Sequence, residues 1–521
     1  MKSDPVHLHP SIFPLFFLCC LLTQGFAQHR SPIQCTANLL QFDEHIGNVQ
    51  IFTGNVEFRH EGSTGYADTV LYYQEKNAIE AFGKEIIIHI NDSVHLYGKH
   101  VHYDGETRIA TIHQDVMLSD NRGTLYTDEL TYFRNEDYGC YLTGGRIVSD
   151  SATLTSVRGY YYTRNHDVFF RKQVEVQHPR FTLTADTLRY NTGSKTVFFT
   201  GPTSMHSGNH SILSENGWYQ TGTEAAAFYQ RSQIYSEKQL LVSDSVHYEN
   251  LTEKGAAYGN ILLLDTETRH CLQGNYMEFD RQSHYAFATD SAMVTYIDDG
   301  DSLFLHADTL WMDLDSADEV RQAFSYPETH FYRKDFQGRC GRMEYMAADS
   351  LVRLLHSPVL WSDSNQFLSD TVLVFLQEDA IREVRLIGHA FVCENLLADI
   401  HFNQIKSPRI VVYFKENKPE HAIAEPHAEC LYYIFEKDTE LVGIHQAEAE
   451  RMRMEFKNNE LQTITFYKQI KGEFGPDPMS DKRYLPDFLW LGNIRPKEKQ
   501  AIFLPDHHER AIAKEEEEDE E

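Results

Sequence analysis

Basic residues are scarce in this sequence. It holds 47 Lys and Arg against 77 Asp and Glu, which gives a formal net charge of −30 over 521 residues. Seven of the acids form the terminal run Glu515–Glu521, so the rest of the chain is strongly acidic as well. Such a surface repels phosphate backbones, which excludes nucleic acid as a partner. The terminal run is typical of a solvated tail.

Cysteine is also sparse, with eight residues in all. Two of them, Cys19 and Cys20, lie in a short apolar run, and no two of the other six form a Cys-x-x-Cys pair. A structural zinc site is therefore not expected. Export would permit disulfides, but the wide spacing fits scattered buried thiols at least as well, and no pairing follows from it.

Familiar catalytic motifs are missing. The sequence contains no Gly-x-Ser-x-Gly elbow, P-loop or His-Glu-x-x-His pattern. We therefore predict no enzymatic activity, no catalytic residues and no cofactor. Aspartates recur at one position of a repeat (68, 128, 186, 244, 308 and 370). Asp beside a strand more often caps turn amides than binds metal, so we predict no metal site.

Long apolar runs are absent beyond residue 27, so no later segment is expected to cross a membrane as a helix. The run Ile12–Leu22 is apolar but too short to span a bilayer. Gly25 and Ala27 offer small residues at the −3 and −1 positions of a cleavage site. Residues 1–27 are thus predicted to be a signal peptide, cleaved near Ala27, and the chain to be exported.

A strand motif is abundant instead. Ala/Ser-Asp-Thr/Ser-Val/Leu begins at residues 67, 185, 243, 307 and 369. Aromatic residues keep the same rhythm, with Tyr132, Tyr161, Tyr190, Tyr219 and Tyr248 each 29 residues after the one before. This period is typical of architectures in which one unit stacks on the next.

A second motif, Gly-Asn-Val-x-Phe at residues 54–58, has weaker copies that alternate with the first. In both motifs apolar and polar residues alternate with a period of two, as in Val174 and Val176, and helical periodicity is nearly absent. Each repeat is therefore predicted to hold at least two strands with one apolar and one wet face. Stacked repeats can bury the apolar faces by forming two facing sheets.

The regularity of the repeat divides the chain. Residues 28–300 hold the clearest repeats, and residues 301–470 hold more divergent ones that continue the stack. Residues 471–521 are predicted to form a Pro-rich cap and an acidic disordered tail. Aromatic residues at Tyr484, Phe488 and Trp490 are expected to dock this cap on the last repeat.

The alternation of Gly-Asn-Val-x-Phe with Ala-Asp-Thr-Val-Leu-Tyr, behind a signal peptide, resembles the OstA-like family. The resemblance is best over residues 48–132 and continues more weakly to about residue 454. The family comprises LptA-type periplasmic bridge proteins of lipopolysaccharide export and the N-terminal domain of the LptD-type translocon. The resemblance implies an all-β fold: an elongated, twisted β-jellyroll or solenoid-like stack of antiparallel strands with repeats of about 29 residues. This chain is longer than a short bridge protein needs, which leaves open whether it is the bridge or a longer paralogue.

The resemblance also implies a non-catalytic function in outer-membrane assembly. Lipopolysaccharide, through the acyl chains of lipid A, would lie in an apolar groove. Other lipopolysaccharide-transport proteins would bind by edge-strand pairing, and copies of the chain would associate head to tail. The expected location is the periplasm, with attachment to the inner or outer membrane through partners. The candidate groove residues are Val56, Phe58, Val70, Tyr72, Ile86, Ile88, Val101, Tyr103, Val116, Leu118, Leu188 and Tyr190.

Two other functions remain open from the sequence alone. One is an extracellular polysaccharide-active enzyme on a β-solenoid, which should place acids beside Lys or Arg at one position of neighbouring repeats. The other is a structural or adhesive repeat protein, which would need no apolar groove.

Overall fold

The computed structural model describes residues 31–43, 49–90, 92–120, 123–149, 152–162, 164–298, 301–316, 319–378, 380–397, 400–436, 440–475 and 483–503. The predicted signal peptide and the acidic tail lie outside the described residues. The chain divides into two compact units: unit 1 comprises residues 1–121 and 131–136, and unit 2 comprises residues 122–130 and 137–521. In the described part no helix is long and apolar enough to cross a membrane.

Unit 1 is a series of antiparallel strands. β3 to β7 pair in chain order, and β1 and β2 pair with the two halves of β3. The elements are β1 (Gln34–Thr36), β2 (Leu39–Asp43), β3 (Val49–His60), β4 (Ser63–Tyr73), the 3-10 turn η2 (Gln74–Lys76), β5 (Ala78–His89), β6 (His95–Asp104) and β7 (Ile109–Asp120).

Unit 2 contains the rest of the strands, and β8 has residues in both units. Its first half comprises β8 (Gly123–Phe133), β9 (Tyr138–Tyr141), β10 (Gly145–Ser149), β11 (Thr153–Ser156), β12 (Arg158–Tyr162), β13 (Asp167–His178), β14 (Phe181–Asn191), β15 (Thr196–Ser207), β16 (His210–Gln220), β17 (Ala225–Tyr235), β18 (Gln239–Glu249), β19 (Lys254–Asp265), β20 (Cys271–Asp280), β21 (Tyr285–Asp298) and β22 (Asp301–Leu314).

The later elements of unit 2 are mostly shorter. They are β23 (Val320–Tyr326), β24 (Thr329–Arg333), β25 (Phe336–Cys340), β26 (Arg342–Met346), η3 (Ala347–Asp349), β27 (Leu351–Leu355), β28 (Val359–Ser362), β29 (Asn365–Leu368), β30 (Thr371–Gln377), β31 (Ala380–Leu397), β32 (His401–Lys415), β33 (Lys418–Ala424), β34 (Ala428–Glu436), β35 (Glu440–Ala449), β36 (Arg451–Lys457), β37 (Glu460–Tyr467), β38 (Lys471–Gly475) and η4 (Lys499–Phe503).

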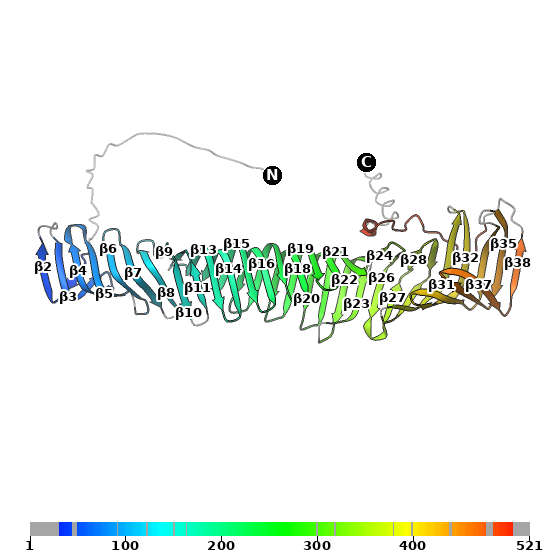
Figure 1. Cartoon of the computed structure of the whole chain (residues 1–521), viewed down its shortest axis with the longest axis horizontal. Helices are drawn as coiled ribbons and strands as arrows, with labels where there is room; N and C mark the ends of the chain where they lie inside the picture. The colour runs from blue at the N-terminus through cyan, green and yellow to red at the C-terminus, as the bar shows by residue number, and fades with distance from the viewer. Residues whose placement is uncertain are drawn as a thin grey trace, which may run out of the picture. The chain divides into compact units, whose positions relative to one another are not determined.

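Two sheets run through unit 2. From β13 to β22 each long strand pairs with the next, and the strands stand side by side (Figure 1). After β22 the pairing splits into two series. Sheet A continues through β23, β26, β27 and β30, and sheet B through β24, β25, β28 and β29, before both rejoin at β31. The long strands therefore contribute one half to each sheet. Since all these pairings are antiparallel, the prediction of an all-β antiparallel stack is confirmed.

A bulge lies in the middle of alternate long strands, at the point where the chain passes from one sheet to the other. In β13 the register shifts between Arg171 and Val174, and both residues between them have positive φ. Such pairs recur at 54–55, 114–115, 230–231 and 259–260, so the bulges share the period of the repeat. A bulge bends the strand and increases its twist, which turns the second half towards the facing sheet.

Aspartates of the repeat lie beside these bulges. Asp68 accepts a hydrogen bond from the backbone N–H of Lys84 at 2.9 Å, and Asp244 accepts one from the Asn260 amide at 2.8 Å. In both cases the carboxylate binds to the next strand of the sheet. The Asp68 contact is the amide-capping role expected from the sequence.

The core of unit 2 lies between the sheets, close to the bulges. Phe170 and Leu188 from sheet A pack with Val174, Leu183 and Ala185 from sheet B in one buried cluster. Burying each large apolar side chain stabilises the fold by about 1.5–3 kcal/mol. Further buried apolar clusters follow along the two sheets.

Residues 483–503 form a C-terminal strap across the outer face of sheet B. Three buried glutamines on separate strands bind it, two through its backbone and the third through an arginine side chain. Gln404 accepts from the N–H of Leu485 at 2.8 Å, Gln366 accepts from the N–H of Leu491 at 2.7 Å, and Gln337 accepts from Arg495 Nε at 2.6 Å. The strap thus runs back along the sheet from β32 to β25, well beyond the last repeat.

The described cysteines are all unpaired thiols, four of them buried. Burial raises the pKa of Cys340 and of Cys393 to about 12. These thiols therefore act as small apolar core residues at neutral pH.

Candidate functional site

A row of apolar side chains follows the inner face of sheet A. Tyr161, Val168, Tyr190, Val197 and Tyr219 are cross-strand partners on five successive strands. All five are half-buried. Tyrosines that lie 29 residues apart in the sequence thus become neighbours on every second strand. We call this row, with its continuation through Ala226 and Tyr248, the tyrosine row.

A second row follows the inner face of sheet B, and we call it the aliphatic row. Its members are again direct cross-strand partners, one from each strand, and all but one are half-buried. They are Leu154, Val176, Leu183, Met205, Ile212, Ile234, Leu241, Leu263, Leu272, Val294 and Leu305.

Both rows lie one step further from the bulges than the buried core. In β13, Phe170 and Val174 are 3% and 1% exposed, whereas Val168 and Val176, two residues further out, are half-buried. Side chains next to the bulges therefore pack as an ordinary core. The two rows present apolar surface that folding alone does not cover, which is what a hydrocarbon ligand would need.

The residues proposed from the sequence to line a groove all lie on inner faces, at two depths. Tyr103, Ile88, Leu118 and Tyr190 are half-buried. The remaining eight are at most 8% exposed and belong to the packed interior: Val56, Phe58, Val70, Tyr72, Ile86, Val101, Val116 and Leu188. Whether any of the twelve contacts lipid stays a prediction.

At one side of the interior of unit 1, polar side chains contact residues 31–33, the first described residues of the chain. His60 lies 2.7 Å from the Tyr103 hydroxyl and 2.9 Å from the Ser31 carbonyl oxygen. Asn77 donates to the same carbonyl at 3.2 Å and accepts from the Ile33 N–H at 3.3 Å. Burial raises the pKa of Tyr103, so its hydroxyl keeps its proton. Here the chain itself covers the inner tyrosines.

None of the aliphatic-row residues was among the groove residues predicted from the sequence. The members of this row lie in the strand halves beyond the bulges, and of the two repeated motifs only the weak copies of Gly-Asn-Val-x-Phe reach them, as at Val176. The available signal was the period-two alternation with polar neighbours at positions such as Met205, which lies between Ser204 and His206.

Comparison with known proteins gives one family. Residues 34–186 and 176–244 match the family described as OstA-like protein. Among solved structures the chain is similar to LptH, described as the LptA homologous periplasmic component of the conserved lipopolysaccharide transport device from Pseudomonas aeruginosa. That match has 18% identity and a TM-score of 0.18, and it covers 20% of this chain and 76% of LptH. No curated protein matches the chain.

Proposed function

We propose, from the premise that residues 34–244 belong to the OstA-like protein family, that this chain is a non-catalytic lipopolysaccharide-transport protein of the periplasm. Its ligand is the acyl part of lipopolysaccharide. The aliphatic row and the tyrosine row of unit 2 bind the acyl chains, while the sugars stay in water.

The observation that carries this proposal is the continuity of the aliphatic row. Each strand from β13 to β22 contributes one apolar residue, directly opposite the residue of its neighbours. Neighbouring strands lie about 4.8 Å apart, so the residues form an apolar track with a short, regular step. An acyl chain on this track meets nearly the same surface at every step.

Transport along such a track needs no covalent step. Each CH₂ group of a lipid that leaves water gains about 0.8 kcal/mol. Because successive residues are similar in size and exposure, a chain that moves by one strand loses and gains similar contacts. The free energy therefore stays nearly level along the row, and the lipid can move without a deep trap.

Partner proteins are proposed to bind at strand edges. Within the described residues β37 pairs with β36 alone and β38 with β35 alone, which leaves one edge of each unpaired. An exposed edge can accept a strand from another chain by backbone hydrogen bonds. This supports pairing with other lipopolysaccharide-transport proteins and head-to-tail self-association.

Binding of purified lipopolysaccharide to the full chain tests the proposal. Ile212 of the aliphatic row and Leu213 are adjacent on β16 but point to opposite faces, and Leu213 is 40% exposed. We expect Ile212→Asp to weaken binding at least tenfold and Leu213→Asp to leave it unchanged. Circular dichroism and thermal melting check that both variants fold. Equal effects of the two variants, or no binding by the wild-type chain, would overturn the proposal.

A further inference from the structure

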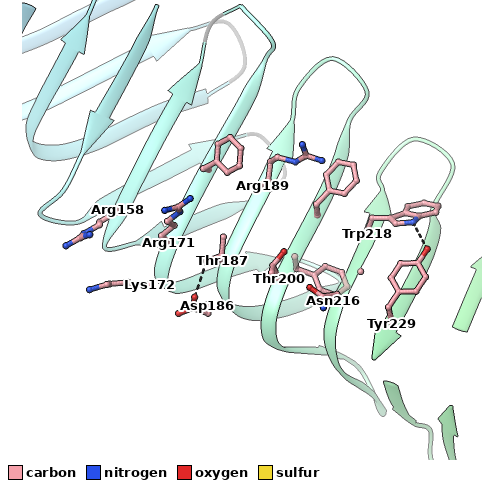
Figure 2. A pocket seen from close by; sticks show the side chains of 14 residues that line it. Arg158, Arg171, Lys172, Asp186, Thr187, Arg189, Thr200, Asn216, Trp218 and Tyr229 are labelled. Carbon is pink, nitrogen blue, oxygen red and sulfur yellow. Dashed lines mark hydrogen bonds between the residues drawn. The ribbon is translucent and has the colours of Figure 1, made fainter. Parts of the chain in front are cut away.

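The outer face of sheet A carries a depression of about 750 Å³ that spans β12 to β17 (Figure 2). Arg158, Arg171, Lys172 and Arg189 line it, together with Trp218 and Tyr229. We call these six residues the basic patch. The patch lies on the opposite side of the sheet from the tyrosine row, because outward and inward residues alternate along each strand.

Two of its arginines face each other directly. Arg158 on β12 is the cross-strand partner of Arg171 on β13, and like charges in this position destabilise a sheet. Among the described residues neither arginine, nor Lys172, has a carboxylate within 4.0 Å. A chain with 30 more acids than bases has thus placed three exposed, uncompensated cations together. An anionic ligand would relieve their mutual repulsion.

Aromatic rings continue the patch along the sheet. Phe169, Arg189, Phe198 and Trp218 are cross-strand partners in that order. The Arg189 guanidinium lies 4.0 Å from the centre of the Phe198 ring and 3.9 Å from Asp167. Trp218 donates to the Tyr229 hydroxyl at 3.3 Å. The patch therefore offers flat apolar faces beside positive charge.

A second set of partners supplies hydrogen-bonding groups. Thr187, Thr200 and Asn216 follow Arg171 across the next three strands. The one carboxylate in the lining, Asp186, accepts a hydrogen bond from the Thr187 hydroxyl at 3.0 Å. Since Arg189 is paired with Asp167, three cations without a carboxylate partner stand against the single carboxylate of the lining, which leaves the depression positive.

We propose that the basic patch binds an acidic oligosaccharide, laid across β12 to β17. The C–H faces of sugar rings stack on Phe198 and Trp218. Arginines bind carboxylate or phosphate groups through two parallel hydrogen bonds, which suits Arg158 and Arg171 to the acidic substituents. The strands beneath pair on both sides, so no free edge is present for an acidic peptide to extend. This site is separate from the acyl-binding rows and does not depend on them.

Calorimetric titration of the full chain with hexagalacturonate tests the proposal. Maltohexaose serves as the neutral sugar and hexaglutamate as the acidic peptide. We expect hexagalacturonate alone to bind, and more weakly as salt is added. Arg171→Gln should weaken binding about tenfold or more, since a hydrogen bond to a charged group is lost. Trp218→Ala should do the same by removing a stacking face.

Two matched variants and one stability measurement complete the test. Arg321→Gln and Tyr258→Ala remove an exposed arginine and an exposed aromatic of sheet A outside the patch, and both should bind like wild type. Arg158→Ser should raise the melting temperature of the free protein, because it removes the like-charge pair, while it weakens binding. The proposal is wrong if hexagalacturonate does not bind, if hexaglutamate binds as tightly, or if the variants in the patch bind like these controls.

Discussion

Tyr72 and Tyr190 hold equivalent positions in the repeat and differ in exposure. Tyr72 is 8% exposed and donates to Asn77, whereas Tyr190 is half-buried beside the core of unit 2. The alternation of residues predicts which face a side chain takes, because the strand period is two. It does not predict how far the side chain is buried, because burial depends on which other parts of the chain cover that face. The sequence therefore identified interior residues but could not separate packed from accessible ones.

Asp280 allows a test of electrostatics at the level of one residue. Lys254 lies 2.8 Å from its carboxylate, and the Ser283 N–H donates to it at 2.9 Å. The ion pair with Lys254 is the main cause that lowers the pKa of Asp280 from 3.8 to about 2. Since the folded pKa lies below the unfolded one, the contribution to stability is present above pH 3.8 and is lost as the pH falls towards 2.

We predict that Lys254→Met lowers stability at neutral pH and that its deficit relative to wild type disappears as the pH falls from about 4 to 2. Urea midpoints measured across this range would show it. A deficit that persists unchanged at pH 2 would mean that the lysine acts through its packing instead.

At the level of elements, the bulges bend the strands, so that the two halves of one strand lie in different sheets. The sequence revealed the positions of some, because Gly54-Asn55 and Gly259-Asn260 suit left-handed backbone. Others use Gln114-Asp115 or Lys172-Gln173, which carry no such signal. At these positions pairing with the neighbouring strands imposes the left-handed backbone conformation. The 29-residue period could therefore be predicted from the sequence, but the passage of each strand from one sheet to the other could not.

Gly259 should be a sensitive position among the bulges. Its φ is +71°, and an added Cβ would lie 2.4 Å from the Asp244 carboxylate. Gly259→Ala is expected to lose about 1–3 kcal/mol in free energy of unfolding, as a strained left-handed residue does. Gly222→Ala is the control, since no atom lies within 4 Å of its added Cβ. Equal urea midpoints for the two variants would argue against a structural role of the bulge.

The strap depends on buried amides that no local pattern distinguishes from exposed ones. Gln366 is fully buried, donates to the Leu489 carbonyl at 2.7 Å and accepts from Trp361 at 3.2 Å. The composition of residues 471–521 suggested a cap but not its path along sheet B. That path rests on Gln337, Gln366 and Gln404, which are far apart in the sequence.

Gln366→Leu should release the middle of the strap. The variant keeps the volume but leaves buried donors and acceptors unpaired, at a cost of about 1–3 kcal/mol each. Hydrogen exchange of peptides from residues 483–503 should then become faster. Gln377→Leu, at an exposed position of sheet A, should leave the exchange unchanged. Unaltered protection in Gln366→Leu would show that apolar contacts such as Phe402 with Trp490 hold the strap alone.

At the level of the whole molecule, a repeated motif yields two kinds of inner surface. In unit 1 the inner tyrosines are covered by residues 31–33. In unit 2 most members of the tyrosine row, from β12 to β18, and of the aliphatic row, as far as β22, remain half-buried. The central claim is that acyl chains of lipopolysaccharide move along these rows. The all-β stack and its apolar interior could be predicted from the sequence, because both follow from periodicity. The continuity of the rows could not, because it depends on strand register.

Photo-crosslinking in living cells tests this claim most directly. A photoreactive residue is placed in turn at Ile212, Ile234 and Leu263 on the aliphatic row, and at the outward neighbours Leu213, Gln233 and Leu262. The account predicts crosslinks to lipopolysaccharide from all three inward positions and from none of the outward ones. Crosslinks that ignore this alternation, or none from the inward positions, would contradict it.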